Sequence, residues 1–128
     1  MYKVYDNENK KWITDKCMIS PDGNLYQIIN KKFIKTMHSN LCSNTSKSQK
    51  YIVYRSIGLT DKSNELIYEG YILREEKGKI GLVHYSTELA AYVFVHVKEN
   101  KFYPLGAELC KKTKILGNVI DDSELLYM

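Results

Sequence analysis

The chain has 128 residues, of which 44% are hydrophobic and 27% are charged, and its formal net charge is +4. This composition excludes a disordered chain, and the length suits one domain that folds without disulfides or metal. No segment approaches the ~20 consecutive apolar residues that a membrane-spanning helix needs, so we expect no membrane partner.

The three cysteines indicate the redox state of the compartment in which the protein is found. Cys17, Cys42 and Cys110 are odd in number and widely spaced, which is typical of free thiols in a reducing compartment rather than of a disulfide scaffold. Residues 1–12 carry no apolar run behind their charges, so the sequence predicts no secretion signal. We therefore expect a cytoplasmic protein.

Strands are expected along the whole chain, because it contains eleven Tyr, three Phe and one Trp but only two Pro. The turn at 6–9 predicts a first hairpin, and the turn at 21–24 a second, with returning strand 25–29. Residues 33–37 are ambiguous between strand and short helix. The polar run 38–50 predicts a surface loop.

The second part of the chain has a regular strand rhythm. A strand at 51–57 is followed by an ordered turn at 58–64, by one helical turn near 107–112 and by a short terminal helix from 121. Five further strands are expected at 67–74, 80–85, 92–97, 102–103 and 114–120. Short strands joined by tight turns predict a curled sheet or barrel. We therefore predict a mainly β protein with minor α, whose N-terminal β-hairpin segment (1–50) precedes a C-terminal barrel (51–128).

Charge is unevenly distributed along the sequence. Residues 1–64 carry 11 basic and 5 acidic groups, whereas residues 65–128 carry 8 and 10. This asymmetry permits head-to-tail attraction between subunits or a basic half that faces nucleic acid. A solvated lysine-rich surface is the commoner outcome of such a composition.

Two basic–aromatic clusters are candidates for nucleic-acid contact, since small barrels bind single strands with a basic groove and stacking rings. Phe33 is the ring of the second cluster. Arginine, which is favoured for phosphate and guanine contacts, occurs only at Arg55 and Arg74. The candidate contacts are Lys10, Lys11, Trp12, Lys31, Lys32 and Lys35.

Catalytic and metal-binding patterns are missing from the sequence. It contains no CxxC, HxxxH or HExxH spacing, so we predict no metal, no cofactor and no catalytic residue. His84 and His96 lie on neighbouring expected strands. Pairing Tyr85 with Tyr92 places His84 opposite Val93 and projects the two histidines from opposite faces.

Three segments of the chain form an ordered set of motifs. The first is the run IGLTDKSNELIYEG at 57–70, the second is the ending 115–119 followed by 123–126, and the third is the opening 2–11. Together these motifs resemble the YopX-like family of phage and prophage proteins. Two positions depart from the family pattern: Tyr71 stands where an acid is usual, and Ser123 where Pro is usual. The resemblance implies a phage or prophage origin, a C-terminal SH3-like β-barrel and assembly into homo-oligomers, but no known activity.

The motif residues also have a structural interpretation. Gly58 can turn the chain through positive φ, Asp61 and Asn64 can bond nearby backbone, and Gly70 and Gly117 are expected at a bulge or bend within strands. The family-motif residues are Gly58, Leu59, Asp61, Tyr68, Glu69, Gly70, Gly117 and Asn118.

These observations predict an accessory protein that binds and self-associates and is not an enzyme. Its expected partners are a second copy of itself and an unidentified host or phage protein. The alternative is a nucleic-acid-binding regulator that uses the basic N-terminal half.

Overall fold

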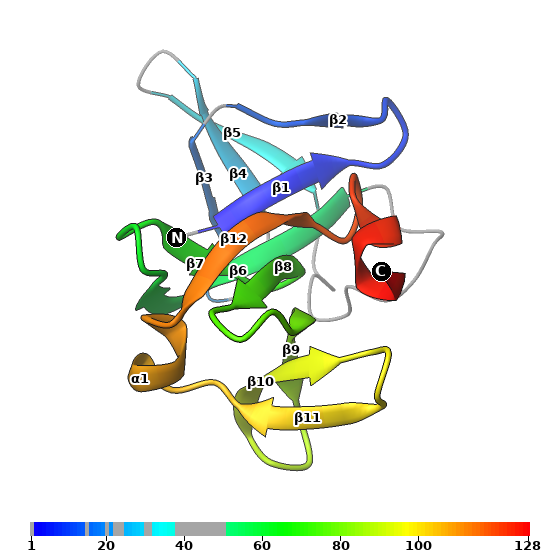
Figure 1. Cartoon of the computed structure of the whole chain (residues 1–128). Coiled ribbons are helices and arrows are strands. Elements are labelled where there is room, and N and C mark those ends of the chain that lie inside the picture. Colours follow the sequence, from blue (N-terminus) through cyan, green and yellow to red (C-terminus); the bar gives the residue numbers. More distant parts are fainter. Residues whose placement is uncertain (1, 15, 20, 22–24, 30–31, 38–50) are drawn as a thin grey trace. The chain divides into compact units, whose positions relative to one another are not determined.

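The computed structural model describes residues 2–14, 16–19, 21, 25–29, 32–37 and 51–128. The expected loop at 38–50 and the turn residues 22–24 lie outside this set. The protein is mainly β, as predicted, and its described residues include one short α-helix and one 3-10 helix (Figure 1). It divides into two compact units, Met1–Arg55 (unit 1) and Ser56–Met128 (unit 2), which we describe in turn.

The first predicted hairpin of unit 1 is confirmed. Strand β1 (Tyr2–Asp6) pairs antiparallel with β2 (Lys11–Trp12) and, on its other side, with the first half of β6 (Tyr51–Thr60). The carboxylate of Asp6 closes the hairpin turn by accepting hydrogen bonds from the N–H groups of Glu8 (3.1 Å) and Asn9 (3.0 Å).

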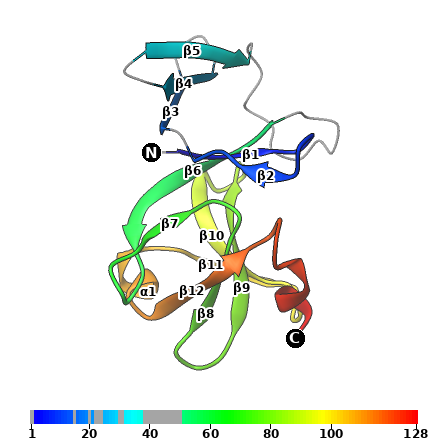
Figure 2. The same cartoon turned by 90° about the horizontal axis from the view of Figure 1, so that it is seen from above.

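Unit 1 also contains a three-stranded antiparallel sheet (Figure 2). Strands β3 (Lys16–Ile19) and β4 (Leu25–Ile29) form the second predicted hairpin. The segment that was ambiguous between strand and helix is the strand β5 (Lys32–Met37), which pairs with β4. The sequence left this choice open because the segment is short and its apolar residues follow no clear period.

The hydrophobic cluster of unit 1 forms between β1 and β6. Val4 and Val53 are direct partners in the antiparallel register, so their side chains project from the same face and pack together. Tyr51 completes the buried cluster, and the partly buried Tyr2 and Ile13 pack against it.

Unit 2 is built on a five-stranded antiparallel sheet with the order β11-β10-β9-β8-β12. This sheet curls into a half-barrel (Figure 1). The end of β6 pairs with β7 within the same unit. The strands are β7 (Leu66–Tyr68), β8 (Tyr71–Glu75), β9 (Ile80–Ser86), β10 (Ala91–His96), β11 (Lys101–Pro104) and β12 (Thr113–Asn118).

The register of β9 and β10 agrees with the prediction from sequence. Tyr85 pairs with Tyr92, and His84 pairs with Val93. The two tyrosine rings meet edge to face at a centroid distance of 5.1 Å. His84 is exposed and His96 is buried, as expected for side chains that project from opposite faces of the ribbon.

The core of unit 2 depends on close approach of one ring to one glycine. Phe94 is 1% exposed. A Cβ placed on Gly81 would lie 2.8 Å from two atoms of the Phe94 ring. The missing side chain of Gly81 therefore lets the ring lie against the strand, in a unit whose Val83 and Leu73 are also buried.

Two short helices cover parts of unit 2. Helix α1 (Ala107–Cys110) buries Cys110, and the terminal 3-10 helix η1 (Ser123–Tyr127) buries Leu126. Both lie where the sequence predicted a helical turn. No helix in the described part of the chain is long and apolar enough to span a membrane.

Two expectations about glycines need correction. Residues 67–74 do not form one strand, because Gly70 adopts φ +76° in a turn between β7 and β8. Gly58 does not end its strand: β6 continues to Thr60, and the φ of +81° at Gly58 accompanies a register shift between Ser56 and Thr60. Positive φ marks both positions, but only the pairing partners decide between a turn and a bulge.

Candidate functional site

The first motif residue to consider is Asp61, which is buried with an exposed fraction of 1%. Its Oδ1 atom accepts hydrogen bonds from the N–H groups of Ser63 (2.8 Å) and Glu65 (3.0 Å). Its Oδ2 atom accepts one from the N–H of Ile115 (3.1 Å) on β12. The prediction that Asp61 closes its turn is confirmed, and the same carboxylate also ties that turn to β12.

Burial opposes ionisation of Asp61 and acts to raise its pKa. The three backbone N–H groups, helped by the nearby charge of Lys114, outweigh that effect, so the pKa is lowered below its usual value of 3.8. Asp61 is therefore an ionised structural anchor rather than a proton donor or acceptor for chemistry.

Asn64 bonds nearby backbone, as predicted, because its N–H donates to the carbonyl of Asp61 (3.0 Å) and closes the turn. Its backbone adopts φ +64°, and its side-chain oxygen has a further, unpredicted role: it accepts a hydrogen bond from the Nζ of Lys111 (2.8 Å). Lys111 also donates to Oγ1 of Thr60 (2.7 Å). Lys111 lies 47 residues from Asn64 in sequence, and its two hydrogen bonds link helix α1's end to the exposed side of the turn.

The predicted bulge at Gly117 is confirmed, because the β12–β8 register shifts between Ile115 and Gly117. A Cβ on Gly117 would collide with the carboxylate of Asp122. That carboxylate accepts a hydrogen bond from the N–H of Asn118 (3.1 Å), and Oδ1 of Asn118 accepts from the N–H of Ile120 (3.0 Å). Gly117 and Asn118 thus shape the chain that leads into η1.

The remaining motif residues fill space in unit 2. Leu59 and Glu69 are half-buried, and Tyr68 is 5% exposed. Tyr71, which replaces the usual acid of the family, is buried with its ring centroid 5.4 Å from that of Tyr68. Within the described chain, no motif residue lines the pocket presented below.

Only one of the two basic–aromatic clusters falls within the described residues. Lys10 and Lys11 are exposed, and the Nζ of Lys10 donates to Oδ1 of Asn7 (3.0 Å). The Trp12 ring is half-buried and packs against Tyr5 and Tyr54, with centroid distances of 5.1 Å and 6.0 Å. Lys31 and the side chains of Lys32 and Lys35 lie outside the described set.

Among the residues that the structure describes, metal-binding side chains do not form a cluster. No group of three or more His, Cys, Asp or Glu side chains there could hold a metal ion. Burial raises the pKa of the Cys110 thiol, which keeps it protonated and unreactive at neutral pH.

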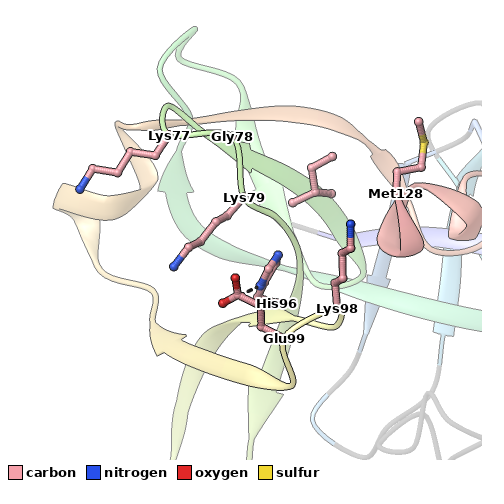
Figure 3. A pocket seen from close by; sticks show the side chains of 8 residues that line it. Lys77, Gly78, Lys79, His96, Lys98, Glu99 and Met128 are labelled. Carbon is pink, nitrogen blue, oxygen red and sulfur yellow. Dashed lines mark ion pairs between the residues drawn. The ribbon is translucent and has the colours of Figure 1, made fainter.

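A pocket of about 540 Å³ opens at one end of the five-stranded sheet (Figure 3). Two adjacent turns form it, β8–β9 and β10–β11, because antiparallel strands return both turns to the same end. Lys77, Lys79 and Lys98 supply three ammonium groups to its lining. Sequence reading missed this site because Lys77 and Lys98 belong to different turns.

A buried histidine and an apolar wall complete the pocket. The Nδ1 of His96 lies 3.3 Å from Oε2 of Glu99. Ile80 and Met128 also line the pocket and offer apolar contact surface. The arrangement can hold an anion with an apolar part, but it brings together no nucleophile and base.

The fold and the site define a small, mainly β protein whose motif residues build turns and bulges. The chain belongs to the YopX protein family, which matches it over residues 1–127. No curated protein matches the chain.

Two solved structures share its fold. Protein yopX from Bacillus subtilis is 15% identical, with a TM-score of 0.58, over 97% of this chain and 95% of that chain. Protein EF1440 from Enterococcus faecalis is 17% identical, with a TM-score of 0.54, over 98% of this chain and 96% of that chain. At these identities the likeness concerns the fold alone.

Proposed function

We propose that this YopX-family protein is a phage or prophage accessory factor that acts in the host cytoplasm by binding and self-association rather than by catalysis. The barrel is proposed to be of the SH3-like class that the motif resemblance implies. Its partners are a second copy of the chain and a host or phage protein.

The observation that carries self-association is the opposite charge of the two units. Unit 1 has ten basic and four acidic residues, whereas unit 2 has nine basic and eleven acidic residues. Opposite net charges favour contact between unit 1 of one copy and unit 2 of the next. Such contact is head-to-tail and weakens as salt screens the charges.

Unit 2 offers apolar surface for this contact at the edge strand β11. Phe102 is 59% exposed. The N–H of Leu105 donates to the carbonyl of Tyr92, so by alternation the backbone groups of Phe102 and Pro104 face away from β10. Pro104 lacks an N–H, which keeps the open edge short. The Phe102 side chain is therefore the expected anchor of the contact.

Light scattering coupled to size-exclusion chromatography tests this proposal. We expect a mass above that of the monomer that rises with protein concentration and falls as salt is added. The variant Phe102→Ser should shift the chain toward monomer, whereas Leu89→Ser, which removes another exposed apolar side chain (52%), should not. A strict monomer at every concentration would refute self-association.

The alternative function is nucleic-acid binding by unit 1, supported by the exposed pair Lys10 and Lys11 beside Trp12. It predicts retardation of labelled mixed oligonucleotides at low salt that weakens as salt rises. The double variant Lys10→Gln, Lys11→Gln should reduce that retardation. Unchanged oligonucleotide mobility with the parent protein would eliminate this function.

A further inference from the structure

The pocket of unit 2 holds its central groups in fixed positions. Figure 3 shows the His96 imidazole between the side chains of Lys79 and Lys98. The Nζ of Lys79 donates to the hydroxyl of Tyr103 (3.0 Å) and lies 4.9 Å from the centroid of that ring. The hydrogen bond to Tyr103 raises the pKa of Lys79 and so favours its charged form.

His96 is buried with an unsatisfied nitrogen. The residue is 7% exposed, and its Nδ1 is fully buried yet makes no hydrogen bond to any described residue. The carboxylate of Glu99 is close, at 3.3 Å, but the two groups are not aligned for a hydrogen bond. A buried polar atom without a partner is costly, and the residue that carries this one lines the pocket.

The lining also carries surplus positive charge. Three of the lining residues are lysines and one, Glu99, is an acid that lies close to His96. Glu75, which is not among the lining residues, also lies near enough to Lys79 to act on its charge. Like charges brought into one pocket repel each other, and an anion bound between them removes that repulsion. Lys77 extends away from His96 in Figure 3, so its attraction acts at longer range than that of Lys79 or Lys98.

Apolar groups stand beside these charges. Ile80 and Met128 line the same pocket, and Met128 is 70% exposed. The volume of about 540 Å³ is within the range of small-molecule sites. An inorganic anion alone would leave this apolar wall unused.

We propose that this pocket binds the phosphate monoester of a small organic molecule. Lys79 and Lys98 contact the phosphate, whose negative charge suits a lining in which lysines outnumber acids. Ile80 and Met128 contact the organic part. This site is separate in its residues from the Phe102 contact proposed above for self-association.

Calorimetric titration of the full chain with four probes tests the ligand class. AMP should bind most tightly, inorganic phosphate more weakly, and cyclic AMP, a singly charged diester with the same base, more weakly than AMP. Adenosine should show no saturable binding. Equal affinities for AMP and cyclic AMP, or no saturable binding of AMP, would overturn the proposal.

Matched lysine variants test the location. Lys98→Gln should weaken AMP binding about tenfold, because it removes a charged contact to the phosphate. Lys77→Gln should weaken it only severalfold at most, and Lys112→Gln, outside the pocket, should leave it unchanged. In nuclear magnetic resonance spectra, AMP should move the ring signals of His96 and not those of His84. Equal losses in Lys98→Gln and Lys112→Gln would show unspecific charge attraction and refute the site.

Discussion

Replacement of Asp61 should destabilise unit 2 more than any change at an exposed acid. Asp61→Ala deprives three backbone N–H groups, those of Ser63, Glu65 and Ile115, of their acceptor. A hydrogen bond to a charged group contributes ~1.5–3 kcal/mol, but water can reach the donors of the exposed Ser63 and Glu65 after the substitution. We expect the free energy of unfolding to fall by about 3 kcal/mol, and by about half of that in Asp61→Asn, which keeps one acceptor oxygen.

Urea unfolding followed by circular dichroism measures this loss, and the melting temperature of Asp61→Ala should fall by more than about 10 °C. The pH dependence has a definite sign. Because the pKa of Asp61 is lowered on folding, its stabilisation is complete above the usual value of 3.8 and is lost as the pH falls through the lowered value. The stability difference between the parent protein and Asp61→Asn should therefore shrink only in acid.

Glu108→Gln is the matched control, since the Glu108 side chain is 92% exposed and its pair with Lys112 is long at 3.9 Å. It should change the free energy of unfolding by less than ~0.5 kcal/mol. A loss below about 1 kcal/mol in Asp61→Ala would refute the reasoning, because it would mean that the three N–H groups find equivalent partners in water.

Three further predictions concern unit 2. Gly81→Ala should lower the free energy of unfolding by about 1–3 kcal/mol, because the added methyl group would press on the carbonyl oxygen of Val95 and on the Phe94 ring. Unfolding in urea without a shift of the midpoint would contradict this. Gly58→Ala should cost about 1 kcal/mol through its φ of +81° alone, since no described atom lies within 4 Å of the new Cβ, and a shift as large as that of Gly81→Ala would point to an unrecognised contact. Cys110 should resist alkylation by iodoacetamide in the folded protein and react after denaturation, as measured by mass spectrometry of its peptide, because burial raises the pKa of its thiol; fast labelling of the native chain would disprove its burial.

Local patterns predicted much of unit 2 correctly. The pairing of Tyr85 with Tyr92 follows from the length of the connection between two apolar strands, and this register places His84 and His96 on opposite faces. Asp61 was assigned to its turn because a short carboxylate readily bonds the N–H groups two and four residues later. Both features depend on residues that are close together in sequence, so they can be predicted from the sequence.

Predictions failed where distant segments decide the outcome. Positive φ was expected at Gly58 and confirmed, but whether it bends a continuing strand or ends it depends on the pairing of β6 with β7. The same holds for Gly70, whose N–H donates to the carbonyl of Val83 (2.9 Å) and whose carbonyl accepts from Val119 (2.8 Å). Neither partner lies near Gly70 in sequence.

Alternation, turn residues and aromatic content were enough to establish a mainly β chain and its hairpins, because these signals act between residues a few positions apart. The family followed from the resemblance of three sequence motifs and not from these patterns. Folding alone brought Asp61 to Ile115, Lys111 to Asn64, and Lys79 to Lys98 around His96. Such contacts join turns that are far apart along the chain, and their formation depends on how the sheet curls and which strand ends it places together. No local sequence pattern predicts which turns come together, so the pocket can be recognised only in the folded protein.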